Sequence, residues 1–333
     1  MHSSKPAPSL STMGKLPTLQ HQAVRDLAWV CFSPPLLNAL PGSKADIVTG
    51  LQNDSALLSW LSAQDQQPQQ LNQYLSQLKS PRLGIYYEAL CAYIWQHYPG
   101  RQLRCKNLQV SDNGKTFGEY DLIGQSATGL YHIEVAVKFY LGLSEKDNEA
   151  NSHWQQWLGP NCNDRLDKKL HRLRDHQLPL SRTTPGIAAL QQQGIPAQQL
   201  HSRLQLQGYL FYPAHSALAT PVHSHSQHLR GLWYYQRDFI KLLKQQANSH
   251  WLELDKPLWL SPAVLYQEHS PAPLNSEAMA QSINDYFTNT INPQHKSQKQ
   301  RPLLLAQMQQ QTQRWQEQQR CFVVPDYWPW GKA

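Results

Sequence analysis

The sequence predicts an α/β (α+β) fold whose core follows the order helix, three strands, helix, strand. Apolar residues recur at helical spacing in one stretch, and three later runs alternate in polarity with turn residues between them, as in a meander of strands. A basic amphipathic stretch and one more apolar run complete the order. In chain order these elements are 81–98, 103–111, 117–123, 130–141, 163–176 and 204–212.

Length and composition are those of a globular protein. A chain of 333 residues can bury a large core, and no apolar run approaches the roughly 20 residues that a membrane helix needs. Residues 1–20 contain no apolar segment of a signal peptide, so we expect a disordered tail, a cytoplasmic location and no membrane partner. The five cysteines form no CxxC pair, which favours reduced thiols over disulfides or a zinc knuckle. The net charge of +7 favours an anionic partner.

Residues 21–80 are expected to form an N-terminal helical layer. Apolar residues at helical spacing predict helices over 23–32, 47–63 and 70–78. None of these stretches carries an obvious group of chemically active side chains. We therefore expect them to pack against the core, which spans 81–214.

Residues 215–333 are expected to be a C-terminal elaboration, mainly helical, packed on the core. Three stretches in it predict helices, the last of them rich in glutamine: 229–246, 275–290 and 303–319. Three histidines lie close together in the loop that precedes them: His223, His225 and His228. No scaffold is predicted around these histidines, so exposed polar residues are favoured over a zinc site.

Acidic side chains lie inside the strongest strand signal. Glu119 and Asp121 share one face of the strand 117–123, because side chains alternate along a strand. On the next strand Glu134 and Lys138 share a face. Ionised groups in such a setting cost several kcal/mol unless they are paired or bind a metal. Both a structural ion-pair network and a divalent cation would offset that cost.

Several segments also resemble a known family. LGIYYEAL, GEYDLI, HIEVAVKFYLG, LGPNCNDRLDKKL, DHQLPLS and CFVVPDYWP are similar to an uncharacterised bacterial family catalogued as domain of unknown function 1853. The resemblance extends over about residues 27–329. That family is placed in the PD-(D/E)XK nuclease-like superfamily, so the resemblance implies a restriction-endonuclease-like core, an αβββαβ mixed sheet flanked by helices.

The resemblance further implies a nuclease that depends on Mg²⁺ or Mn²⁺ and hydrolyses phosphodiesters in DNA or RNA. Mg²⁺ prefers hard oxygen ligands, neutralises phosphate charge and lowers the pKa of a bound water. Asp121 and Glu134 on neighbouring strands would be ligands, with Glu119 beside them. By the same resemblance the carbonyl of Val135 would supply a further oxygen.

The expected catalytic side chains depart from the superfamily pattern in one respect. Glu88, on the helix before the meander, would hold a second ion or a ligand water, and Lys138 would orient the attacking water. The superfamily places its lysine two residues after the acid, where this chain has Ala136. Lys138 lies four residues after Glu134, about 13 Å along an ideal strand instead of about 7 Å. A β-bulge would shorten that gap, or His132 would take the water instead.

A basic helix follows the meander and has two interpretations. Four cationic side chains lie on its outer face: Arg165, Lys168, Lys169 and Arg172. They form either a solvated helix face or a seat for nucleic-acid phosphates. A non-catalytic module that binds nucleic acid or protein and retains the nuclease fold is therefore the alternative to a nuclease.

Overall fold

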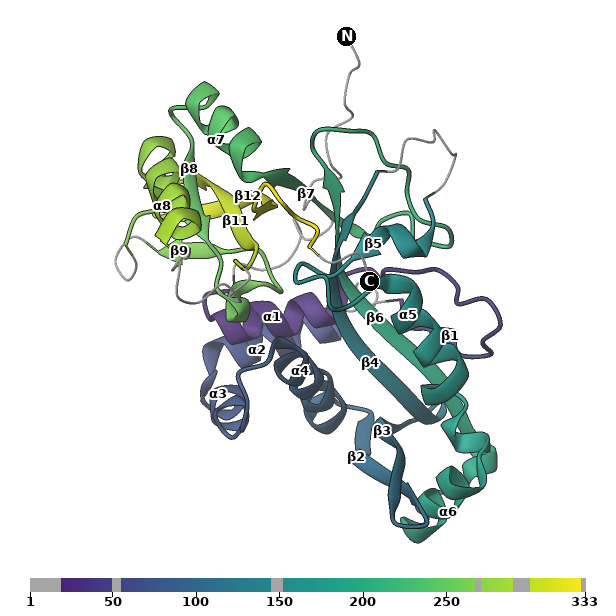
Figure 1. The fold of residues 1–333 in the computed structure, drawn as a ribbon. Coiled ribbons are helices and arrows are strands. Elements are labelled where there is room, and N and C mark those ends of the chain that lie inside the picture. Colours follow the sequence, from purple (N-terminus) through teal and green to yellow (C-terminus); the bar gives the residue numbers. More distant parts are fainter. Residues whose placement is uncertain (1–18, 50–54, 145–151, 267–270, 290–299, 331–333) are drawn as a thin grey trace.

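The structure is a computed structural model that describes residues 19–49, 55–144, 152–266, 271–289 and 300–330. Most of the expected N-terminal tail lies outside these residues. The described part is a mixed α/β structure in which a large mixed sheet is flanked by helices (Figure 1). None of the described helices combines the length and the apolar character needed to cross a bilayer.

The described strands form one twelve-stranded sheet. Nine of them follow the order β10-β8-β11-β12-β7-β6-β4-β3-β2, while β1 pairs with β6, β5 with β4 and β9 with β12. The strands are β1 (Asp46–Ile47), β2 (Arg101–Asp112), β3 (Lys115–Ser126), β4 (Gly129–Gly142), β5 (Trp157–Leu158), β6 (Leu200–Pro213), β7 (Leu229–Tyr235), β8 (His250–Glu253), β9 (Val264–Tyr266), β10 (Leu274–Asn275), β11 (Leu303–Gln310) and β12 (Arg314–Val324).

The helices cover both faces of this sheet (Figure 1). They are α1 (Gln22–Phe32), α2 (Ser55–Gln66), α3 (Gln69–Ser76), α4 (Leu83–His97), α5 (Leu166–Arg172), α6 (Thr184–Gln192), α7 (Gln236–Gln245) and α8 (Ser276–Asn289). A π-helical turn, Leu173–Gln177, continues α5. From α4 to β6 the α-helices and strands run α4, β2, β3, β4, β5, α5, α6, β6; those predicted for this part of the chain are confirmed, whereas β5 and α6 are not predicted by the sequence.

The hairpin of β2 and β3 follows directly from its turn sequence. Asp112 pairs with Lys115, and the two residues between them, Asn113 and Gly114, have φ of 48° and 76°. Asn-Gly tolerates positive φ at both positions, as a two-residue hairpin turn requires. The predicted turn is thus confirmed.

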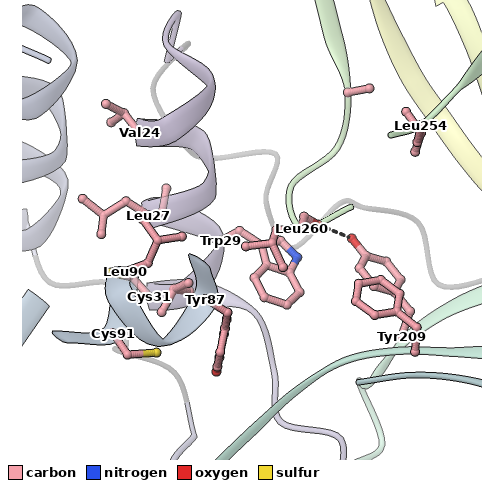
Figure 2. Packing of buried hydrophobic residues seen from close by; sticks show 14 of the residues in the cluster. Val24, Leu27, Trp29, Cys31, Tyr87, Leu90, Cys91, Tyr209, Leu254 and Leu260 are labelled. Carbon is pink, nitrogen blue, oxygen red and sulfur yellow. Dashed lines mark hydrogen bonds between the residues drawn. The ribbon is translucent and has the colours of Figure 1, made fainter. Parts of the chain in front are cut away.

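Side chains of β4 alternate between two packed layers. Ile133 and Phe139 face the apolar cluster of α1 and α4, whereas Ala136 and Tyr140 face the cluster of α5. Figure 2 shows Leu27 and Cys31 of α1 beside Leu90 and Cys91 of α4, all of them buried. Burying a side chain the size of leucine contributes about 1.5–3 kcal/mol. The strand is therefore fixed between two cores.

Three predicted helices differ from the structure. The helix expected over 47–63 begins at Ser55 among the described residues, because Ile47 pairs with Leu204 of β6. The stretch 229–246 begins with strand β7, and its helix starts only at Gln236. Strand pairing with β6 and β12 outweighs local helix propensity there.

The helix predicted for the glutamine-rich stretch 303–319 is wrong, because this stretch forms strand β11 and the first part of β12. β11 lies between β8 and β12, and its first four residues are buried. Glutamine is a good helix former in isolation, but a central strand position gives each backbone group a partner on both sides. Tertiary pairing therefore decides this segment.

Strands β7 and β12 continue the sheet from β6 into the C-terminal part of the chain, since β7 pairs with β6 and β12 pairs with β7, both in parallel. A buried ion pair lies at this junction. Arg320 donates to both carboxylate oxygens of Glu317 at 2.6 and 2.9 Å, and its guanidinium lies 4.3 Å from the Tyr209 ring centroid. The Tyr209 hydroxyl donates to the Leu260 carbonyl at 3.0 Å (Figure 2).

Candidate carboxylate site

Strands β3 and β4 separate at two acidic residues. Their pairing runs from Ser126 opposite Gly129 to Leu122 opposite Ile133, and it ends there. The next facing positions are Asp121 and Glu134. The amide of Val135 donates to Asp121 Oδ2 at 3.0 Å, so the carboxylate occupies the gap that the ladder leaves. The sequence placed these carboxylates on neighbouring strands, and the structure brings them together.

Glu134 is fully buried and has two neutral hydrogen-bond partners. Its Oε1 lies 3.0 Å from His132 Nε2, and its Oε2 accepts a hydrogen bond from Gln177 Nε2 at 2.6 Å. Gln177 lies at the end of the π-helical turn that follows α5, and its Oε1 accepts from Lys169 Nζ at 3.2 Å. In the described part of the chain no lysine or arginine lies within ion-pair distance of Glu134 or Asp121.

The protonation of the site reflects its burial. Burial, together with the charge of Glu134, raises the pKa of Asp121 to about 7. Burial also raises the pKa of Glu134 to about 7, whereas nearby Lys169 opposes this shift. Burial lowers the pKa of His132 to about 4, so its imidazole is neutral near pH 7. Two carboxyls in one partly desolvated place titrate as a pair, and at neutral pH they hold roughly one proton between them.

Replacing either carboxylate of this pair with its neutral amide is expected to stabilise the metal-free protein at alkaline pH. Because the folded-state pKa values lie above the ordinary ones, the pair's stabilising contribution is fully present below about pH 4 and is lost as the pH rises from there through about 7. Asp121→Asn and Glu134→Gln should each raise the free energy of unfolding by about 1–3 kcal/mol near pH 8, with a smaller gain near pH 5.

Urea unfolding in EDTA at the two pH values measures this difference. Asp175→Asn is the control, because Asp175 lies on the π-helical turn that also carries Gln177, but is exposed and pairs with Arg174. The control should show no gain at alkaline pH. Destabilisation by Asp121→Asn near pH 8 would contradict the raised pKa of the pair.

Two further acidic residues lie near the pair. The charge of Glu88 from α4 raises the pKa of both Asp121 and Glu119, and Glu88 itself lies 3.6 Å from Lys106 of β2. Burial is the main cause of the raised pKa of Glu119. Among the described residues, however, no three His, Cys, Asp or Glu side chains are grouped so that they could hold a metal ion. The protein therefore offers a cation two carboxylates, Asp121 and Glu134, as many Mg²⁺ sites do when water and substrate supply the rest.

The backbone of Val135 lies at the same place. In an antiparallel pair a residue exchanges both its N–H and its C=O with the facing strand, so both groups point to one edge. Since the Val135 amide donates to Asp121, we expect its carbonyl to face the same side of β4. The ligand role of Val135 stays a prediction.

The contacts of Lys138 and Lys169 differ from those that the sequence predicted. Lys138 Nζ lies 2.5 Å from Asp164 Oδ2, to which the Tyr140 hydroxyl also donates at 3.2 Å. Lys169 is expected on the outer helix face, but its charge instead lowers the pKa of both Asp121 and Glu134. Burial is the main cause of the lowered pKa of Lys169 itself, and the charge of nearby Lys138 lowers it further, whereas the charges of Glu134 and Asp121 oppose that shift.

The spacing of residues in α5 and the turn after it indicates that Lys169 and Gln177 face inward. Leu166, Leu170 and Leu173 mark the buried stripe of the helix, and Lys169 and Gln177 extend the same stripe at spacings of three and four residues. The other basic residues lie elsewhere. Lys168 and Arg172 are exposed, and Arg165 binds Asp167 through two hydrogen bonds of 2.6 and 2.9 Å.

Comparison with known proteins decides the family. A family model described as "Domain of unknown function (DUF1853)" matches residues 25–324. The chain belongs to the DUF1853 family. No curated protein and no solved structure matches it significantly.

The histidine-rich loop of this DUF1853 protein is built around one buried side chain. His228 Nε2 lies 2.9 Å from the Tyr212 hydroxyl, and its Nδ1 lies 2.6 Å from the carbonyl oxygen of His225. Arg230 donates to the same Nε2 at 3.2 Å. Both ring nitrogens therefore have protein partners, and within the described chain the three histidines do not form a metal-binding group.

Proposed function

We propose that this DUF1853 protein is a Mg²⁺- or Mn²⁺-dependent nuclease with a restriction-endonuclease-like core. The observation that carries the proposal is the pair of the half-buried Asp121 and the buried Glu134, which lie side by side without a cationic partner in ion-pair contact in the described structure. A divalent cation between them would offset their mutual repulsion. The order α4, β2, β3, β4, α5, β6, with β5 and α6 as additional elements and with β6 parallel to β4, supports the assignment of the core.

The donor set fits a hard cation. Asp121, Glu134 and the Val135 carbonyl would hold it with oxygen atoms alone, and Glu88 and Glu119 add negative charge around them. When bound, the ion supplies charge neutralisation at the phosphate and a water of lowered pKa. Gln177 and His132 keep Glu134 in place by occupying one oxygen each.

Lys169 is the lysine that we assign to the reaction in place of Lys138. It donates to Gln177, whose amide in turn donates to Glu134, so its ammonium lies one side chain away from the carboxylates. A partly desolvated ammonium at this position stabilises negative charge that develops on a phosphate. Lys138 is already paired with Asp164.

Nucleic acid would reach the site along α5. Lys168 and Arg172 are exposed on this helix, and the charge of Arg172 lowers the pKa of Glu134. Cationic side chains beside a metal site provide the phosphate contacts that nucleic-acid binding requires. The net charge of +7 acts in the same direction.

The test is a cleavage assay with end-labelled DNA and RNA, single- and double-stranded. We expect cleavage with Mg²⁺ or Mn²⁺, none with EDTA, and loss of about 10²–10³-fold or more in Glu134→Gln. Full cleavage by Glu134→Gln would show that a contaminating nuclease or another site is responsible, and would overturn the proposal.

The alternative is a module that binds nucleic acid without cutting it. One observation favours it: both oxygens of Glu134 already have protein partners, so a cation would have to share or displace them. This alternative predicts binding that weakens with salt, depends on Lys168 and Arg172, and proceeds without turnover.

A further inference from the structure

A cavity of about 240 Å³ lies on the face of β4 opposite to Glu134. Ile133 forms part of its wall, and side chains alternate along a strand, so this cavity and the carboxylates are on different faces. Cys91 and Trp95 of α4, Arg101 of β2 and Arg203 of β6 also line it. Two guanidinium groups from distant parts of the chain therefore meet in one small space.

Both guanidinium groups lie over aromatic rings. The Arg203 guanidinium carbon lies 3.5 Å from the Tyr131 ring centroid. The Arg101 carbon lies 4.8 Å from the centroid of Trp95 and 5.7 Å from that of Tyr98. Stacking on a ring uses the flat face of a guanidinium and leaves its N–H donors free at the edge.

Neither guanidinium has a protein acceptor within the part of the chain that the structure describes. Other buried or half-buried arginines have protein acceptors: Arg320 binds Glu317, Arg165 binds Asp167, and Arg230 donates to the Tyr212 hydroxyl. The carboxylate that lines the cavity, Asp46, faces Arg203 in strand register but forms no ion pair with it at 4 Å or less. Burial lowers the pKa of Arg101, and the charge of Arg203 lowers it further. The two like charges thus remain uncompensated.

We propose that this cavity binds a phosphate-type oxyanion, either free phosphate or a phosphate monoester group. Guanidinium groups present paired N–H donors that match the oxygens of phosphate, and two of them would neutralise a dianion. The cavity is smaller than the 300–1,000 Å³ typical of sites for drug-sized ligands, which favours a compact anion. The inference does not depend on the proposed nuclease activity.

Isothermal titration with inorganic phosphate, at constant ionic strength and without divalent cations, tests the proposal. We expect saturable binding to the wild-type protein that Arg101→Gln and Arg203→Gln each weaken by about tenfold or more. Arg101→Lys and Arg203→Lys keep the charge but lose the paired donors, and should show an intermediate loss. The matched control is Arg104→Gln, because Arg104 lies on the same strand and is exposed, donating to Gln125.

Absence of phosphate binding by the wild-type protein would overturn the proposal, as would unchanged binding in both glutamine variants. A second arm identifies the source of the phosphate. Short oligonucleotides with and without a terminal phosphate compete against inorganic phosphate. Competition by the phosphorylated strand alone supports the site as one for strand ends, and competition by neither supports it as one for free phosphate.

Discussion

Replacing Lys169 with methionine is expected to lower metal-dependent cleavage about 10²–10³-fold, whereas Lys138→Met should retain most of the activity. Lys169 reaches Glu134 through Gln177, and its charge affects both carboxylates of the pair. Lys138 is held by Asp164. Single-turnover cleavage of labelled nucleic acid in Mg²⁺ measures the difference.

Unfolding measurements separate a role in catalysis from a role in folding. The Lys169→Met variant removes a desolvated ammonium, so it should unfold at the wild-type urea concentration or above. Binding of the substrate in EDTA should also persist. The assignment would be wrong if Lys138→Met were inactive and Lys169→Met fully active, because the lysine on β4 would then be the one that acts.

Removing Glu317 is expected to have the largest effect on stability. The Glu317 carboxylate binds Arg320 and accepts from the amide of Ala263 at 2.8 Å, and both charged side chains are almost fully buried. Glu317→Ala leaves an unpaired guanidinium in the interior, which costs about 3–5 kcal/mol in free energy of unfolding. Equilibrium urea unfolding measures this loss.

Two further variants show how much of that loss comes from the unpaired buried charge. Adding Arg320→Met to Glu317→Ala removes the stranded charge and should restore part of the stability. Asp238→Ala breaks an ion pair with Lys241 on the surface of α7 and should change stability by less than about 1 kcal/mol. If Glu317→Ala cost no more than this surface control, the buried pair would not stabilise the junction.

The strands that carry the carboxylates could be predicted because their signal is local. Alternating polarity in 117–123 and 130–141, with Asn113-Gly114 before them, defines the hairpin and the faces of Asp121 and Glu134. The stretch 303–319 could not be predicted in the same way. Its glutamines favour a helix locally, whereas pairing of β11 with β8 and β12, and of β12 with β9, makes the stretch two strands.

The position of the lysine was less predictable for a related reason. Sequence spacing describes distances along one strand, so it drew attention to Lys138. Lys169 and Gln177 reach Glu134 from another element, through a helix that changes to π-helical turns at Leu173. Arrangements of this kind, like the cavity that Arg101 and Arg203 both line, depend on packing between segments far apart in sequence.

A crystal soaked in Mn²⁺ near pH 8 tests the central claim most directly, and its anomalous scattering locates the ion. We predict a peak between the carboxylates of Asp121 and Glu134, next to the Val135 carbonyl, that is absent from the Asp121→Asn variant. A soaked crystal with no peak there, and with Glu134 still bound only to His132 and Gln177, would contradict the account.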